Sequence, residues 1–203
     1  GKDGGLFVQG NKRVRIDGST TIDFVTNSGI GDAVIQSKSA DVIFGSAFTY
    51  KGFQTSDLFI DGETGVTFNA GSSIEYANTS ASAHIGIQAN AGTIAFSGQP
   101  FAFNNTSTGN THIWAGTNVT NASGAPLTFT YKSRNAAGQH IDMYAGQNIT
   151  MNDKLTFTHD DAAGHRGDIA LRAFTNAATL FGMASTPAAG CPVRCSDGSL
   201  TPT

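Results

Sequence analysis

The stretch IDMYAGQNITMNDKLTF, from Ile141 to Phe157, decides the fold. Its apolar residues come in three pairs with i, i+2 spacing: Ile141 with Met143, Ile149 with Met151, and Leu155 with Phe157. This spacing is typical of a short strand that buries one face. Gly, Asn and Asp residues separate the pairs. The stretch therefore predicts three short strands joined by tight turns.

The same organisation returns along the chain at a nearly fixed interval. Leu127-Thr-Phe-Thr130 recurs as Leu155-Thr-Phe-Thr158, and Ala115-Gly-Thr-Asn118 recurs as Ala145-Gly-Gln-Asn148. Such a fixed interval indicates a solenoid or a repeat array. No segment carries a sustained 3.6-residue apolar stripe, so helical repeats are not expected. Three strands per turn, stacked in register, predict an all-β parallel β-helix.

The periodicity predicts about six to seven coils, with a period of about 28 residues in the C-terminal half. We expect a right-handed helix, because the strict hexapeptide rhythm of left-handed β-helices is absent. Apolar pairs place coil starts near positions 14, 34, 58, 85, 113, 141 and 169, so the coils are expected to lengthen towards the C-terminus. The predicted organisation is a lead-in or cap (1–13), a β-helix domain (14–183) and a C-terminal tail (184–203).

Composition restricts the partners. Charged residues make up 13% of the 203 residues, against about 25% in average globular proteins. The formal net charge is −3, and the one basic cluster, Lys12-Arg13 with Arg15, is too short for a nucleic-acid face. No apolar run approaches the ~20 residues that span a membrane. We therefore expect no nucleic-acid partner and no membrane insertion by this segment.

The two cysteines, Cys191 and Cys195, lie in Cys-Pro-Val-Arg-Cys. A redox pair usually has two intervening residues rather than three, and a zinc site needs a second pair that this sequence lacks. We interpret the cysteines as a small disulfide loop in the tail, which favours an oxidising, extracellular location. No metal and no cofactor is expected.

Three histidines keep the same interval as the strand repeats: His84, His112 and His140, followed by Asp168. If the register holds, their side chains stack in one column. Neighbouring imidazoles could share a metal or act as a pH-sensitive strip. The simpler interpretation, which we favour, is a structural polar ladder that precedes one strand of each coil.

Two further groups are candidate ligand-binding residues. Arg166-Gly167-Asp168 is an RGD tripeptide before a strand and is a candidate for integrin binding; Asp168 also fills the ladder position. The aromatic residues that we expect to stack on carbohydrate are Trp114, Tyr131 and Tyr144.

Catalysis is not expected. Glycan-cleaving enzymes with this fold need two or three converging carboxylates. The best candidates, Asp160 and Asp161 with Asp142 and Asp153, do not recur one period apart; Lys132 and Ser133 stand one period before Asp160 and Asp161. A flat Thr-x-Thr face at Leu127–Thr130 and Leu155–Thr158 is only two coils deep, which is too small for ice binding.

The segments Ile141-Asp-Met-Tyr-Ala-Gly-Gln-Asn-Ile-Thr150 and Ile113–Thr120, with their Leu-Thr-Phe-Thr partners, resemble repeats of large bacterial exported β-helix proteins. These are the filamentous-haemagglutinin type and autotransporter passengers. The resemblance implies a non-catalytic adhesin or stalk segment, extracellular or on a bacterial cell surface. Its partners would be a glycan, a host-surface protein or further copies stacked end to end. The alternatives are a self-assembling subunit of an extracellular filament or surface layer, and a polysaccharide-cleaving enzyme.

Overall fold

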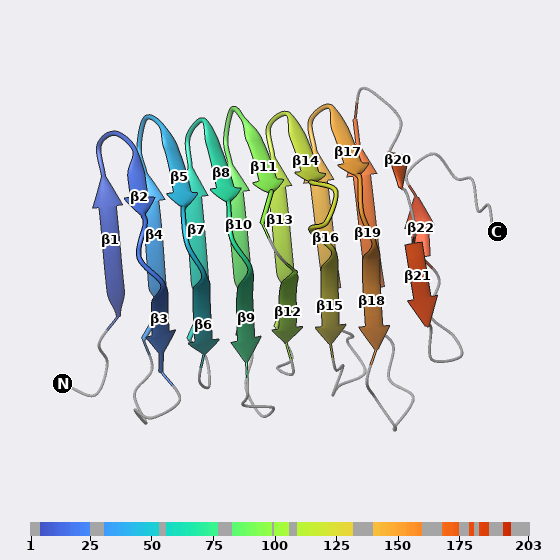
Figure 1. Ribbon diagram of the computed structural model, residues 1–203, viewed down its shortest axis with the longest axis horizontal. Helices are drawn as coiled ribbons and strands as arrows, with labels where there is room; N and C mark the ends of the chain where they lie inside the picture. Colours follow the sequence, from blue (N-terminus) through green and yellow to red (C-terminus); the bar gives the residue numbers. More distant parts are fainter. Residues whose placement is uncertain are drawn as a thin grey trace.

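Short strands joined by turns make up the computed structural model of the chain (Figure 1). It describes residues 5–24, 31–52, 56–76, 83–98, 100–105, 109–131, 140–159, 168–174, 179–180, 183–186 and 193–195. In these ranges no helix is long and apolar enough to cross a membrane. Every strand pairing is parallel, and each strand pairs with its counterpart one coil away.

Three sheets contain the described strands. Sheet A comprises β1 (Leu6–Gly10), β4 (Ala33–Ser37), β7 (Leu58–Gly62), β10 (Ile85–Ala89), β13 (Thr111–Ala115), β16 (His140–Ala145), β19 (Asp168–Ala173) and β22 (Val193–Cys195). Sheet B comprises β2 (Val14–Ile16), β5 (Asp41–Phe44), β8 (Gly65–Phe68), β11 (Thr93–Phe96), β14 (Asn118–Asn121), β17 (Asn148–Met151) and β20 (Thr179–Leu180). Sheet C comprises β3 (Thr20–Asp23), β6 (Phe48–Gly52), β9 (Ser72–Tyr76), β12 (Phe101–Asn105), β15 (Leu127–Tyr131), β18 (Leu155–His159) and β21 (Met183–Thr186).

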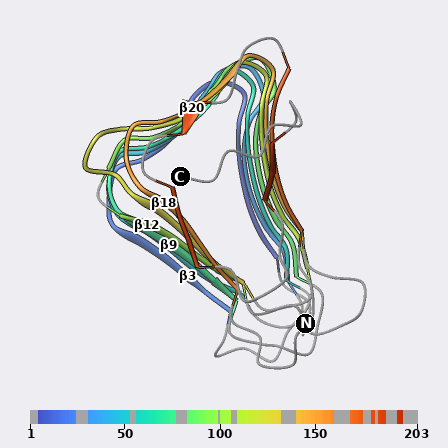
Figure 2. The same ribbon diagram turned by 90° about the vertical axis from the view of Figure 1, so that its right-hand side faces the viewer.

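The coils outline a three-sided prism, seen from its C-terminal end in Figure 2. The strands of sheet A run upward and those of sheet C run downward in Figure 1. In Figure 2 sheet A lies on the right and sheets B and C on the left, so the chain turns anticlockwise as it approaches the viewer. This is a right-handed parallel β-helix with three strands per coil, as the sequence predicts.

The core is built from the i, i+2 apolar residues, which alternate with partly exposed neighbours in nearly every strand. Stacked coils place like residues above one another. Phe103, Phe129 and Phe157 form one such column, with ring centroids 4.5 and 5.2 Å apart and nearly parallel planes. Burying one phenylalanine stabilises the fold by about 1.5–3 kcal/mol, and each aromatic pair adds about 0.5–1.5 kcal/mol. The aromatic columns therefore hold successive coils in register.

Register in the C-terminal half follows the predicted repeats. Leu127 pairs with Leu155 and Phe129 with Phe157, and Ala115 pairs with Ala145. One inward column of sheet A has nearly even spacing between coils; in chain order it reads Val8, Ile35, Ile60, Ile87, Ile113, Met143 and Leu171. The first coils are already as long as the later ones, so the predicted lengthening towards the C-terminus is wrong.

The error arises in the first coils. Val14 belongs to sheet B and pairs with Val42, whereas Val34 belongs to sheet A. The sequence pattern does not distinguish these two valines, because short alternating apolar pairs look the same in any of the three sheets. The coil begins with β1, inside the predicted lead-in, and strand pairing also continues past residue 183 into β21 and β22.

Candidate functional site

The three faces of the prism differ in chemistry. In the C-terminal half, the outward positions of sheets B and C carry Thr, Asn and Ala: Thr93, Ala95, Asn118, Thr120, Asn148 and Thr150 on sheet B, and Ala102, Asn104, Thr128, Thr130, Thr156 and Thr158 on sheet C. Among the described residues, the exposed large hydrophobic side chains are Phe7, Phe59 and Trp114 on the outer face of sheet A, Phe174 directly after β19, and the inward-facing Leu6 of the first coil. Sheet A therefore has the surface suited to binding an apolar or amphipathic ligand.

Two columns of side chains cover the outer face of sheet A. Each column follows the residues that are paired from one strand of sheet A to the next. The first column contains Phe7, Val34, Phe59, Gly86, His112, Asp142 and Ala170. The second contains Gln9, Gln36, Asp61, Gln88, Trp114, Tyr144 and Arg172.

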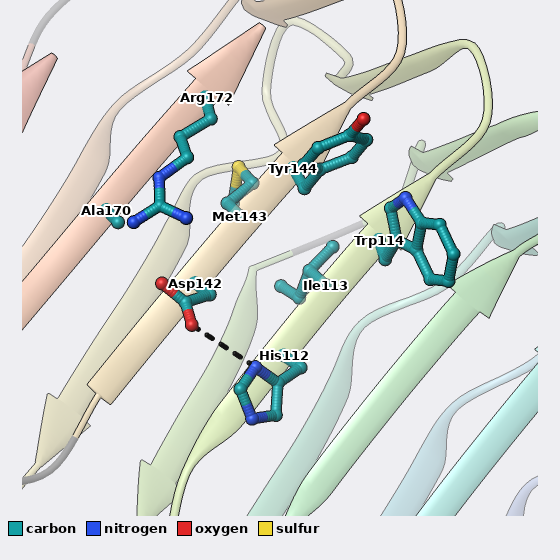
Figure 3. Close-up of a pocket in the computed structure, with 8 residues that line it drawn as sticks. All are labelled: His112, Ile113, Trp114, Asp142, Met143, Tyr144, Ala170 and Arg172. Carbon is teal, nitrogen blue, oxygen red and sulfur yellow. Dashed lines mark ion pairs between the residues drawn. The ribbon is translucent and has the colours of Figure 1, made fainter. Parts of the chain in front are cut away.

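A hollow of about 350 Å³ opens on this face over β13, β16 and β19 (Figure 3). Its lining is His112, Ile113, Trp114, Asp142, Met143, Tyr144, Ala170 and Arg172. Ile113 and Met143 belong to the core, so they contribute to the hollow from beneath. The other six residues stand on the outward positions of the three strands, and the small side chain of Ala170 leaves space between the larger ones.

Aromatic rings form one side of the hollow. Trp114 and Tyr144 lie edge to face, with ring centroids 5.9 Å apart and an interplanar angle of 86°. Phe174 packs on the other side of Tyr144, at 4.5 Å and 37°. Trp114 keeps 47% of its surface exposed. The rings thus support one another and leave the indole open to a ligand.

Polar groups form the other side. His112 Nδ1 lies 3.4 Å from Asp142 Oδ2, which is an ion pair when the imidazole is protonated. Arg172 is exposed on the next strand, β19, and takes part in none of the ion pairs among the described residues. Hydrogen-bond donors and acceptors therefore stand beside an aromatic surface, which is the usual chemistry of small-ligand sites.

Trp114 and Tyr144, two of the predicted carbohydrate-stacking residues, come together in this hollow. The prediction for Tyr131 is wrong: its side chain is only 2% exposed. Tyr131 continues the inward series of Leu127 and Phe129 on β15, so the alternation of that strand places it in the core. The sequence interpretation missed Arg172 and Phe174 and assigned His112 to a different role.

The predicted column of three histidines is also wrong in part. His112 pairs with Gly86 and Asp142, on the outer face of sheet A, and not with another histidine. His140 pairs with Asp168, as predicted. The coil from β10 to β13 is shorter than the average, so His112 lies two positions beyond the residue that pairs with His84. The coil from β13 to β16 is longer and brings His140 back into the column. The column consequently reads His84, Asn110, His140 and Asp168.

This column is a ladder of hydrogen-bond acceptors at the corner before sheet A. The backbone N–H of Asp57 donates to Asp32 Oδ1 at 3.0 Å, and the N–H of His84 donates to Asp57 Oδ1 at 2.7 Å. The N–H of Asn110 then donates to His84 Nδ1 at 3.1 Å. Burial raises the pKa of Asp57 despite the bond from His84, which lowers it. These contacts favour the structural interpretation of the column.

Several predicted residues lie outside the described part of the chain. Arg166 and Gly167 are among them, as are Cys191, Asp160 and Asp161. Asp168 and Cys195 are described as members of β19 and β22, without their side chains. Integrin binding and the disulfide loop therefore stay predictions.

Comparisons with known proteins find no family model, no curated protein and no solved structure that matches this chain. The parallel β-solenoid is established by the strand pairing alone. Its role has to be inferred from surface chemistry, and that chemistry distinguishes sheet A from the other two sheets.

Proposed function

We propose that this chain is a non-catalytic, glycan-binding segment of an extracellular bacterial adhesin or stalk, and that the hollow on sheet A holds the glycan. The observation that carries the proposal is the pair of exposed Trp114 and half-buried Tyr144 beside His112, Asp142 and Arg172.

Sugar rings are amphipathic, and the hollow matches them. A pyranose presents C–H groups on its faces and hydroxyl groups around its rim. An exposed indole offers a flat apolar surface to such a face, with stacking worth on the order of 1 kcal/mol per ring. The carboxylate of Asp142 accepts hydrogen bonds from hydroxyl groups, and the guanidinium of Arg172 donates them.

The hollow has little that supports catalysis. Glycoside hydrolysis usually needs two carboxyl groups about 5–10 Å apart, one of them protonated. Asp142 is the single carboxylate among the lining residues, and it faces His112. Binding without cleavage is the simpler use of this site.

The solenoid suits a surface role. Stacked coils about 4.8 Å apart give a straight scaffold that displays outward side chains at regular intervals. Low charge and the repeats that resemble exported β-helix proteins support a location outside the cell.

A glycan array tests the proposal, with purified wild type, Trp114→Ala and Thr128→Ala. Thr128 occupies an outward position on sheet C, so its variant is the matched control. We expect wild type and Thr128→Ala to bind the same glycans, and Trp114→Ala to lose affinity about tenfold or more. Absence of any bound glycan with wild type, or undiminished binding by Trp114→Ala, contradicts the proposal.

Self-assembly through coil ends is a second candidate, favoured by the first coil. β1, β2 and β3 each pair on one side only among the described strands, and the inward-facing Leu6 is 36% exposed. Such an edge accepts another parallel coil. Light scattering and negative-stain microscopy over a concentration series test this: rods that lengthen with concentration favour assembly, and a stable monomer of 21.0 kDa rules it out.

A further inference from the structure

Phe59 forms a second exposed aromatic surface on sheet A. Its side chain, on β7, is 43% exposed. Its partner on β10 is Gly86, and a Cβ atom placed on that glycine would lie only 2.8 Å from Phe59 Cδ1 and 3.1 Å from Cε1. The ring therefore lies over the backbone of Gly86, in space that any other residue would fill. We call this pair the Phe59–Gly86 platform.

The platform borders the hollow. Gly86 pairs with His112, the first lining residue of the hollow in the same column. From β7 to β19 the outer face spans four coil spacings of about 4.8 Å, or roughly 19 Å. Aromatic side chains thus stand along this distance: Phe59 at its start on β7, Tyr144 on β16, and Phe174 directly after β19.

Polar side chains run beside the platform. Asn90 Nδ2 donates hydrogen bonds to Asp61 Oδ1 at 3.2 Å and to Glu63 Oε2 at 3.0 Å. Gln88, between Asp61 and Trp114 in the second column, donates to Asn90 Oδ1. This strip offers amide and carboxylate groups next to the ring, the same combination that the hollow presents.

We propose that the Phe59–Gly86 platform is a second sugar-stacking subsite, and that sheet A binds an extended chain of pyranose sugars lying along the solenoid axis. This inference rests on the glycan-binding function proposed for the hollow. The direction follows from the columns: a ligand that crosses the strands meets Phe59 on β7, then His112 and Trp114 on β13, and then Asp142 and Tyr144 on β16. A ligand parallel to one strand would meet two outward side chains of that coil. A peptide strand would pair with a sheet edge instead of lying on this face.

Binding of β-1,4-linked glucose and N-acetylglucosamine oligomers, measured by calorimetry, tests the inference. For wild type we expect the hexasaccharide to bind about tenfold more tightly than the disaccharide, because only the longer chain reaches the platform. Phe59→Ala and Phe59→Leu should lose that gain and keep the disaccharide affinity. Gly86→Ala should do the same, since its methyl group displaces the ring without removing it. Trp114→Ala should weaken both ligands.

The outcomes separate the two proposals. Equal affinity of wild type for disaccharide and hexasaccharide overturns the platform subsite and leaves the hollow as the binding site. A length-dependent gain that survives in all three variants of the platform also overturns it. If neither series binds wild type, the glycan-binding function of the hollow fails together with the inference. Circular dichroism confirms that each variant is folded before its affinities are compared.

Discussion

His84 Nδ1 accepts a hydrogen bond from the backbone N–H of Asn110, 3.1 Å away and one coil further along the chain. The imidazole can accept at Nδ1 only when that nitrogen carries no proton, so the proton of the neutral ring sits on Nε2. The side chain therefore satisfies a backbone donor at the corner that leads into sheet A. A histidine that looks like a metal ligand in the sequence has a structural role here.

Replacing His84 tests that role. His84→Ala removes the acceptor of the Asn110 N–H, and we expect the free energy of unfolding to fall by about 1–3 kcal/mol. His84→Asn keeps a side-chain acceptor at the same position and should cost less. Urea denaturation measures both. Equal losses for the two variants would mean that packing of the ring, and not its hydrogen bond, stabilises the corner.

Asp57 should give stability a distinct pH dependence. Burial raises the pKa of Asp57 in the folded protein. The contribution of the neutral carboxyl to the free energy of unfolding is therefore fully present below the unfolded-state pKa of about 3.9, and it is lost as the pH rises through the folded-state pKa. Asp57→Asn keeps an acceptor for the His84 N–H and does not ionise. We expect the variant to gain stability relative to wild type as the pH increases from acid to neutral, measured by urea denaturation at several pH values.

Asp41 supplies the matched contrast. Its hydrogen bond with Arg13, 2.6 Å long, lowers the pKa of the carboxyl. The contribution of the Asp41 carboxylate to the free energy of unfolding is present above the unfolded-state pKa of about 3.9, and it is lost as the pH falls through the lowered folded-state pKa. Asp41→Asn should therefore become less stable than wild type as the pH rises, by a small amount because Arg13 is exposed. The same pH trend in both variants would refute the assignment for Asp57.

Gly146 is expected to be intolerant of any side chain. A Cβ atom there would overlap the carbonyl oxygen of Gly116, in the preceding coil. Gly146→Ala must force two coils apart at this corner, and overpacking of this kind costs about 1–3 kcal/mol. Gly18→Ala is the control, because nothing lies within 4 Å of its Cβ position. Thermal denaturation should show a lower midpoint for the first variant and no decrease for the second.

The fold was predictable because its signal is local and repeated. Pairs such as Leu155 with Phe157 mark a strand without reference to any distant residue, and their recurrence from Leu127 to Leu155 marks the stack. The number of strands per coil follows from the same pattern. The assignment of Val14 to a sheet was not predictable in this way, because the first coils lack a recognisable marker of each corner.

The site depends on which residues of neighbouring coils are paired, and the sequence indicates this pairing less clearly than it indicates the strands. A uniform period of about 28 residues predicts that His112 is paired with His84. The coil between β10 and β13 is shorter than that, so His112 is paired with Gly86 on one side and with Asp142 on the other. Tyr131 was a different kind of error, since its i, i+2 relation to Phe129 already indicated the core. The contact of the Phe59 ring with Gly86 cannot be predicted from the sequence, because the two residues are brought together only by the pairing of β7 with β10.

Fluorescence of Trp114 tests the binding role of sheet A most directly. Trp114 is the single tryptophan of the sequence and stands at the hollow. On titration with the soluble glucose and N-acetylglucosamine hexasaccharides, we expect a saturable shift of its emission to shorter wavelength, as a sugar ring replaces water on the indole. Free tryptophan titrated with the same sugars is the control. Calorimetric binding without any change in emission would place the ligand elsewhere and contradict the assignment of the hollow.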